Sequence, residues 1–292
     1  MRLEHTADAL RVLAGDVEIL RYVHTPHMDP FEGPKPYMHP VRTLAGDVVT
    51  AYRPHDHRWH KGIQMTASHV SGENFWGGGT YVRGKGYVDL PNVGTMRHEE
   101  FTELACGDGR VLVAERLTWH TQAGEHWIDE NRAFTVHGVA DGAWTLTFTT
   151  SLRNVRDEPL VFGSPTTNGR ELAGYTGLFW RGPRSFTGGD IIAPDGRGGE
   201  EMMGRPAPWL AFVGRHDEVD RASTLLFVDP PGARTRWFVR SEPFAAVNPS
   251  FAFFDELVLE PGDTLDLAHR VVVADTAWER DRIEAHAKEQ TW

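Results

Sequence analysis

Apolar and polar residues alternate along several segments of the chain, and this alternation limits the folds that it can adopt. In AWTLTFTTSL (143–152) large apolar side chains fall on one face and threonines on the other. VLVAERLTWH (111–120) and TLDLAHRVVV (264–273) follow the same period of two. This period is that of a β-strand with one buried face. Turn sequences such as CGDG, ADGA and EPGD lie beside these segments and indicate antiparallel pairing.

Many short strands separated by Gly and Pro turns are typical of a β-sandwich or barrel. The 292 residues contain no tandem repeat and no evident linker, so we expect a single domain over residues 1–292. The end of the chain differs, because good helix formers follow a capping-box pattern of Thr276 and Glu279. We therefore expect an all-β fold, a large antiparallel β-sandwich with a short C-terminal helix.

Composition excludes several classes of protein. A single cysteine, Cys106, rules out an internal disulfide, and no stretch approaches the ~20 apolar residues of a membrane span. The charged N-terminus does not resemble a signal peptide, so we expect a cytoplasmic protein that does not act at a membrane. A net charge of −11 without a basic stripe argues against nucleic acid as a partner. The sequence contains no phosphate loop and no dinucleotide-binding motif, so we expect no nucleotide cofactor. Whether the protein forms a homo-oligomer is left open.

The most distinctive polar segment is HDHRWHKG, which contains His55, Asp56, His57 and His60. If it is extended, His55 and His57 point to the same side, and His60 joins His57 only through a bend. Imidazoles this close suit one divalent metal ion. They equally suit proton transfer near neutral pH. The remaining alternative is a hydrogen-bonded loop that has only a structural role.

Glu115 is a second candidate for proton transfer. By alternation it shares an otherwise apolar face with Val113, Leu117 and Trp119. A carboxylate on such a face either has a partner or has a raised pKa that suits acid–base chemistry.

Two further segments carry residues that suit a small polar ligand. SGENFWGGG offers Asn74 and Trp76 before a glycine run, where the backbone can approach a ligand closely. SPTTNGRELAGYTGLFWRGP is rich in polar and small residues, and Arg181 within it suits bidentate binding of oxygen atoms. The pocket candidates in this second segment are Asn168, Arg170, Glu171, Tyr175 and Arg181.

These motifs resemble those of the PmoA-like domain family of unknown function, whose usual pattern includes a DHPHHRG-type stretch followed by a glycine and FW. Four residues of this chain match that stretch: Asp56, His57, His60 and Gly62. Trp59 stands where a histidine is common and Lys61 where an arginine is usual. The later segments RPAPWLAFVG, WFVRSEPFAAVNPSFAF and LEPGDTLDLAHRVVVAD are also similar, so the resemblance covers nearly the whole chain. The family name implies a methane monooxygenase, which we reject because that enzyme is integral to the membrane.

The segment LRNVRDEPLVFGSPTTNGRELAGYTGLFWRG is in addition similar to the core of galactose-mutarotase-like supersandwiches. This resemblance implies a sugar bound on the open face of the sandwich and chemistry on a sugar or keto-glycoside, by hydrolysis, elimination or isomerisation. His57 and His60 would then hold a metal or act as acid and base, with Glu115 as the second proton-transfer group. Trp76, Asn74, Asn168 and Arg181 would orient the sugar. The alternatives are a non-catalytic carbohydrate-binding module and a structural protein.

Overall fold

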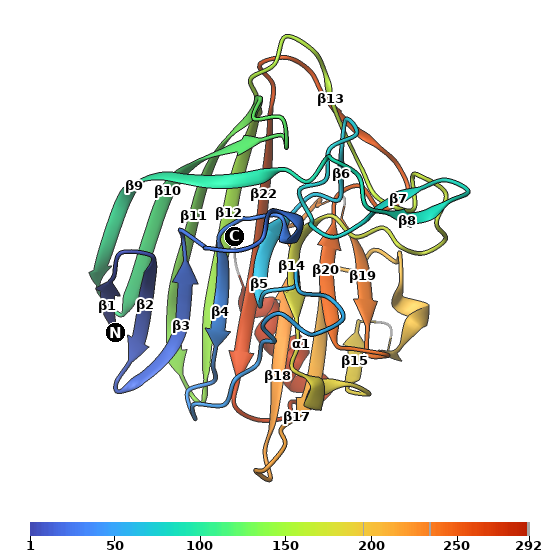
Figure 1. Cartoon of the computed structure of the whole chain (residues 1–292). Coiled ribbons are helices and arrows are strands. Elements are labelled where there is room, and N and C mark those ends of the chain that lie inside the picture. The colour runs from blue at the N-terminus through green and yellow to red at the C-terminus, as the bar shows by residue number, and fades with distance from the viewer. Residues whose placement is uncertain (195, 234, 291–292) are drawn as a thin grey trace.

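The computed structural model describes residues 1–194, 196–233 and 235–290, and its framework is a pair of large antiparallel sheets (Figure 1). Within these residues one sheet has eight strands, in the order β1-β2-β3-β4-β5-β14-β20-β19. The bounds of these strands are β1 Arg2–His5, β2 Ala9–Ala14, β3 Val17–Val23, β4 Tyr37–Val41, β5 Ile63–Thr66, β14 Gly177–Arg181, β20 Ala246–Ser250 and β19 Arg236–Arg240.

The second sheet has nine strands, in the order β16-β15-β17-β18-β22-β12-β11-β10-β9. The bounds are β16 Gly196–Gly198, β15 Asp190–Ala193, β17 Trp209–Arg215, β18 Ala222–Val228, β22 Thr264–Ala274, β12 Ala143–Asn154, β11 His126–Ala140, β10 Arg110–His120 and β9 Thr95–Gly107. The long strands β9 to β12 form consecutive hairpins: β9–β10 turns at CGDG, β10–β11 over residues 121–125, and β11–β12 at ADGA.

Two small sheets and a few short helices complete the described chain. One small sheet joins β21 Leu257–Leu259, β13 Leu160–Gly163 and β6 His69–Val70, and the other joins β7 Thr80–Val82 and β8 Gly86–Val88. The 3-10 turns are η1 Pro30–Glu32, η2 Arg184–Phe186 and η3 Glu200–Met202, and the α-helix is α1 Arg280–Glu289. No helix of the described residues is long and apolar enough to cross a membrane.

The core between the large sheets is built from the faces that the alternation predicts. On β12 the side chains of Trp144, Leu146 and Phe148 are buried in this core, as expected. Fully buried tryptophans come from both sheets: Trp119, Trp144, Trp180 and Trp237. An aromatic side chain of this kind buries 150–250 Å², worth about 4–6 kcal/mol of transfer free energy before the entropy of folding is counted. The all-β sandwich is thus confirmed.

The C-terminal helix is also confirmed, but the expected cap is wrong. The helix begins at Arg280 with Glu279 as its N-cap residue, and no side chain caps it. The hydroxyl of Thr224 on β18 donates to the Thr276 carbonyl and accepts from the Trp278 N–H. Trp278 is buried against the outside of the nine-stranded sheet. These contacts hold the chain extended through Trp278, so the helix starts one turn later than local sequence indicates.

The two faces of β14 determine where a ligand can be bound. Leu178 and Trp180 belong to the core between the sheets. Phe179 points the other way and packs with Trp76 in a separate cluster. On β19 the same division places Trp237 in the core and Phe238 outside it. The outer face of β14, β20 and β19 therefore has an aromatic floor of its own.

Candidate functional site

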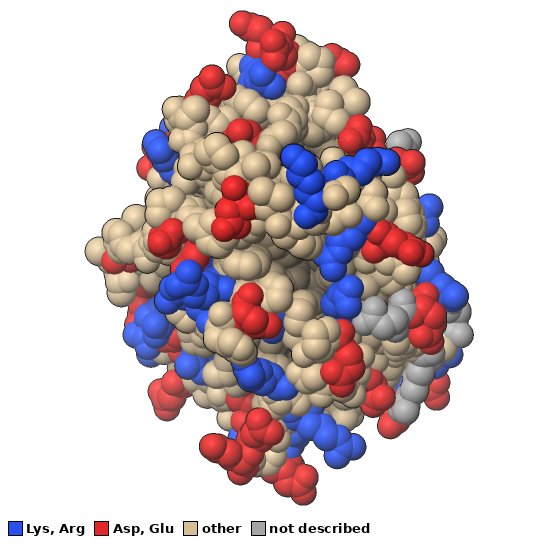
Figure 2. All heavy atoms as spheres, turned by 45° about the vertical axis from the view of Figure 1, so that its right-hand side comes forward, with Lys and Arg blue, Asp and Glu red and all other residues tan. Residues whose placement is uncertain are grey.

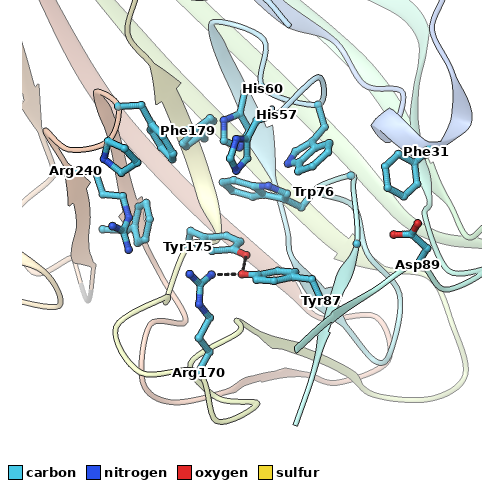
Figure 3. A pocket seen from close by; sticks show the side chains of 16 residues that line it. Phe31, His57, His60, Trp76, Tyr87, Asp89, Arg170, Tyr175, Phe179 and Arg240 are labelled. Carbon is cyan, nitrogen blue, oxygen red and sulfur yellow. Dashed lines mark hydrogen bonds between the residues drawn. The ribbon is translucent and has the colours of Figure 1, made fainter. Parts of the chain in front are cut away.

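A cavity of about 550 Å³ lies on this outer face, beneath the loops that carry η1, β7 and β8 (Figure 3). Eight Phe, Trp and Tyr side chains line it: Phe31, Trp59, Trp76, Tyr87, Tyr175, Phe179, Phe238 and Phe244. The charged groups and histidines among the described lining residues are His57, His60, Asp89, Arg170 and Arg240. An apolar cavity with a few polar groups is the usual form of a small-molecule site.

The aromatic lining is a continuous packed layer. The Trp76 ring lies 4.8 Å from that of Phe179 and 4.4 Å from that of Tyr175, measured between centroids. Trp59 meets Phe31 edge to face at 5.9 Å. Rings that pack on one another in this way have little rotamer freedom, so their faces are presented to a ligand without further ordering.

His57 and His60 come together through two successive turns. The His57 N–H donates to the Pro54 carbonyl at 3.0 Å, and the His60 N–H donates to the His57 carbonyl at 2.9 Å. The two imidazoles stack with centroids 4.7 Å apart. The extended conformation considered from the sequence is thus wrong, because these backbone bonds wind the segment. The His55 ring contacts the Arg184 guanidinium.

Asp56 lies beside His57 and affects its charge. His57 Nδ1 is 3.1 Å from Asp56 Oδ2, although this contact lacks the alignment of a hydrogen bond. Burial lowers the pKa of His57, and the Asp56 carboxylate opposes that shift. The carboxylate favours a proton on Nδ1, which leaves the lone pair on Nε2. Neutral His57 is therefore equipped to act as a base at neutral pH.

His60 is held in one tautomer by Arg181. The Arg181 guanidinium lies 3.0 Å from His60 Nδ1. A guanidinium has donors only, so Nδ1 must be the acceptor and neutral His60 carries its proton on Nε2. Burial, with the nearby charges of His57 and Arg181, holds the pKa of His60 well below its usual range. His60 is thus a neutral hydrogen-bond donor and not a base.

Arg181 lies behind His60 and does not reach the cavity lining. Its guanidinium carbon sits 3.8 Å from the centroid of the Phe244 ring, and its Nε is buried without a hydrogen-bond partner. Desolvation lowers the pKa of Arg181 to about 10, so it stays charged at neutral pH. The role predicted for Arg181, direct contact with a ligand, is therefore replaced by contact with His60.

A divalent metal at His57 and His60 stays a prediction, and the local chemistry does not favour it. The His60 Nδ1 lone pair is used by Arg181, and Nε2 carries the proton, so His60 has no free lone pair for a metal ion. The guanidinium of Arg181 also repels a cation. Among the described residues, no three His, Cys, Asp or Glu side chains are grouped to hold a metal ion.

Asn74 does not line the cavity but shapes the turn that carries Trp76. Its Oδ1 accepts hydrogen bonds from the N–H groups of Trp76 at 2.8 Å and Gly77 at 3.0 Å. Its Nδ2 donates to the Gly78 carbonyl at 3.1 Å. Gly78 has a φ of +71°, and a Cβ there would lie 2.7 Å from the Trp59 ring. The glycine run thus allows Trp59 and Trp76 to occupy neighbouring walls.

Buried charges support the same loop from below. Lys35 is 2% exposed and donates to the Trp76 carbonyl at 2.8 Å and the Gly33 carbonyl at 2.7 Å. Lys61 lies 2.9 Å from a carboxylate oxygen of Glu32. Lys61 stands where the resembled family usually has arginine, and here it fixes the histidine turn to η1. These groups position the walls of the cavity without facing it.

The opposite end of the cavity carries a phenol pair, in which Tyr175 was a candidate from the sequence and Tyr87 was not. The hydroxyls of Tyr87 and Tyr175 are 2.5 Å apart, and Arg170 donates to the Tyr87 hydroxyl (Figure 3). Arg170 and Tyr175 belong to the polar segment identified from the sequence. Tyr87 and Asp89 alternate at the end of the β7–β8 hairpin, a spacing that places both on one side.

Two other lining residues were missed because they lie in an ordinary strand sequence. Phe238 and Arg240 alternate with core residues of β19 and so face outward together. The feature of WFVRSEPF that could have identified them is its period of two, which places an arginine on the outer face. It could not show that this face is covered by distant loops.

Besides Asn74 and Arg181, two further predicted site residues lie outside the described lining of this cavity. Glu115, on β10, is 2% exposed and bonds to Tyr22 and to His98, the latter at 2.6 Å. It therefore belongs to a buried polar network between the sheets that joins β10 to β3 and β9. Asn168 donates to the Ser164 carbonyl at 3.1 Å and closes the loop after β13.

Comparison with known proteins gives a family and several distant structures. A family model described as "Family of unknown function (DUF6807)" matches residues 9–288. No curated protein matches the sequence. A doubly substituted GH36 alpha-galactosidase AgaA from Geobacillus stearothermophilus, in complex with stachyose, has a TM-score of 0.47 at 13% identity, over 89% of this chain and 40% of that chain. AgaA from the same organism also matches, with a TM-score of 0.44 at 12% identity over 89% of this chain and 40% of that one.

A TPR-domain containing protein from Parabacteroides distasonis has a TM-score of 0.37 at 10% identity, over 93% of this chain and 47% of that chain. This chain therefore spans less than half the length of each of these structures. The matched family model confirms that the family is one of unknown function, whereas the PmoA-like and galactose-mutarotase-like resemblances stay predictions. Since that model covers nearly all of the sequence, the chain belongs to the family of unknown function DUF6807.

Proposed function

We propose that this protein binds a sugar in the cavity beside His57 and acts on it as a carbohydrate-active enzyme. The observation that carries the proposal is the combination of aromatic walls with a stacked histidine pair at one end, of which His60 is buried and His57 partly exposed. Aromatic faces stack on the C–H faces of pyranose rings, and polar groups between them bind hydroxyls. A volume of about 550 Å³ is of the size usual for small-molecule sites.

The proposed chemistry is proton abstraction beside a carbonyl of a keto-sugar or keto-glycoside. His57 Nε2 takes the proton from the carbon next to the carbonyl, and the electron pair moves to the carbonyl oxygen. The His60 Nε2–H donates to that oxygen as its negative charge develops. A neutral imidazole suits this role because a donor of higher pKa than imidazolium matches an enolate better. Return of the proton gives isomerisation, and departure of a neighbouring oxygen substituent gives elimination.

Hydrolysis by a pair of carboxylates fits this cavity less well. Such hydrolysis places two Asp or Glu side chains on either side of the glycosidic bond. Asp89 is the one carboxylate among the described lining residues, and Glu115 lies in the polar network between the sheets. Proton transfer by His57 requires no second carboxylate.

A non-catalytic sugar-binding module is the second candidate. It is favoured by the same aromatic lining and needs no base. The two candidates differ in what His57 does. In a binding module His57 contributes one hydrogen bond, whereas in the enzyme it transfers a proton in every turnover.

Deuterium exchange separates these candidates. Keto-glycosides are incubated with the protein in D₂O, and NMR follows deuterium entering the carbon beside the carbonyl. We expect exchange with the wild type, and a 10²- to 10⁴-fold loss in His57→Gln with sugar affinity changed by less than about threefold. His27→Gln is the matched control, because His27 is 80% exposed. Binding without exchange would leave only the module, and absence of any sugar binding would overturn both.

A further inference from the structure

Taken together, the charged side chains that line the cavity differ in sign from the net charge of the whole chain. The protein has a net charge of −11. The described lining residues nevertheless include two arginines, Arg170 and Arg240, and one carboxylate, Asp89. In the space-filling view, basic side chains cluster beside the hollow of the face that comes forward (Figure 2). A local excess of positive charge in a concave site attracts an anionic ligand.

Arg170 is held in place by a phenol and has no acidic partner among the described residues. Its guanidinium donates to the Tyr87 hydroxyl and stacks over the Tyr87 ring at 5.0 Å. A guanidinium has five N–H donors, so most of them stay available. Its fork matches the two oxygens of a carboxylate. Tyr87 thus fixes the plane of Arg170 while leaving its donors for a ligand.

The arginine end and the histidine end are joined by a chain of aromatic contacts. The His60 ring meets Trp76 at 5.7 Å, and Trp76 packs on Tyr175 at 4.4 Å. The Tyr175 hydroxyl reaches that of Tyr87, which accepts from Arg170. Figure 3 shows the histidines on the far side of Trp76 from Arg170. A sugar over Trp76 and Tyr175 would therefore present different substituents to the two ends.

We propose that the ligand is an acidic sugar, whose carboxylate is bound by Arg170. This inference rests on the proposed function, because it assumes a sugar in this cavity. Arg170 comes from the loop after β13, and Arg240 lines the same cavity from the end of β19. The carboxylate end anchors the molecule, and the carbon that loses its proton lies at the His57 end. The class of substrate is then a keto-uronic acid or its glycoside, whose keto group lies toward His57.

Calorimetric titration with matched pairs of sugars tests this inference. The pairs are glucuronate with glucose, galacturonate with galactose, and mannuronate with mannose, and glucose 6-phosphate is included as a different anion. We expect at least one uronate to bind ten times or more tighter than its neutral partner, and the preference to shrink as salt is raised. Glucose 6-phosphate is expected to bind more weakly than that uronate.

Variants assign the preference to the proposed residue. Arg170→Gln should weaken uronate binding tenfold or more and change neutral sugar binding by less than twofold. Arg170→Lys keeps the charge without the planar fork and should retain part of the preference. Arg116→Gln is the control, because Arg116 is exposed and pairs with Glu100. Both residues lie on the nine-stranded sheet, and the cavity lies on the eight-stranded one. Thermal unfolding of each variant verifies that it is folded.

The outcomes distinguish the two proposals. Equal binding of uronates and neutral sugars would overturn the acidic-sugar inference and leave sugar binding intact. Tighter binding of the sugar phosphate would show an anion site that is not a carboxylate site, which also overturns it. Failure of both acidic and neutral sugars to bind would overturn the proposed function itself.

Discussion

At the scale of single residues, the candidate site depends on which nitrogen of each histidine carries a proton. Asp56 favours the proton on His57 Nδ1, and Arg181 requires the proton of His60 on Nε2. The two adjacent imidazoles therefore have opposite properties: at Nε2, His57 has a lone pair and His60 has an N–H donor. Charged neighbours that never touch the ligand decide this division of roles.

Removing the Asp56 carboxylate should change the pH profile of the proposed reaction. A base must be unprotonated, so activity falls as the pH drops through the pKa of His57, which burial places below 6.5. Asp56 opposes that shift, so Asp56→Asn should move the acid limb to still lower pH and reduce the plateau on the order of tenfold. The readout is kcat/KM of deuterium exchange between pH 4.5 and 8. An acid limb that does not move would mean that another group is the base.

Glu115 should matter for stability and not for ligand binding. Its carboxylate accepts from Tyr22 and contacts His98, and the replacement Glu115→Gln leaves these buried partners without a charged acceptor. We expect a loss of about 2–4 kcal/mol in the free energy of unfolding in urea. Sugar affinity and exchange rate should stay within twofold of the wild type. Glu100→Gln, which breaks an exposed pair with Arg116, should cost less than about 0.5 kcal/mol.

At the scale of elements, the long connection between β4 and β5 links the cavity to the eight-stranded sheet. Gly62 directly precedes β5 and has a φ of +56°, and its carbonyl accepts from the Arg181 N–H at 2.9 Å. The same glycine therefore sets the start of β5 and the approach of Arg181 to His60. No other residue type fits at this point, because a Cβ would lie 2.0 Å from the Met38 carbonyl oxygen.

Gly62→Ala should consequently destabilise the protein strongly. The new methyl adds a backbone clash to the strain of a left-handed conformation, and we expect a loss of about 3 kcal/mol or more. Gly15→Ala is a matched control, because its φ is +58° and nothing lies within 4 Å of a Cβ there. The control should cost only about 1 kcal/mol, the strain alone. Equal losses in urea unfolding would show that the close approach to Met38 relaxes at little cost.

At the scale of the whole molecule, the sandwich has two kinds of buried surface. The space between the two large sheets (Figure 1) is filled by the core. The outer face of β14, β20 and β19 carries a separate aromatic cluster and is covered by loops that enclose the cavity (Figure 3). Several histidines of the folded protein are neutral because they are buried, and the free energy of unfolding therefore depends on pH. Burial lowers the pKa of both His24 and His39 to about 4.

Stability should therefore fall as the pH drops from about 6.5 to about 4. In that window the unfolded chain binds protons at His24 and His39, at an ordinary pKa of about 6.5, whereas the folded protein does not. Each histidine then costs about 1.4 kcal/mol per pH unit. Urea unfolding at pH 7 and at pH 5 measures the loss, and His24→Gln should reduce the slope. His27→Gln, at an exposed position, should leave the slope unchanged.

Local sequence determined the strands and their inward faces. The alternation in β10, β12 and β22 predicts which residues enter the core, and the short turns predict hairpins, because both depend only on neighbouring residues. The alternation in β10 also placed Glu115 correctly on a buried face. The start of α1 was wrong because a distant residue, Thr224, competes with the expected cap.

The candidate site was decided by tertiary structure. The segment from His55 to His60 supplies two residues of the cavity lining, His57 and His60. Its winding and the pairing of these two histidines follow from backbone bonds and from Arg181 on β14. Tyr87 and Arg240 join the cavity from elements that are far apart in the chain. A period of two shows which way a side chain points, and only the folded sheets and loops show what lies opposite it.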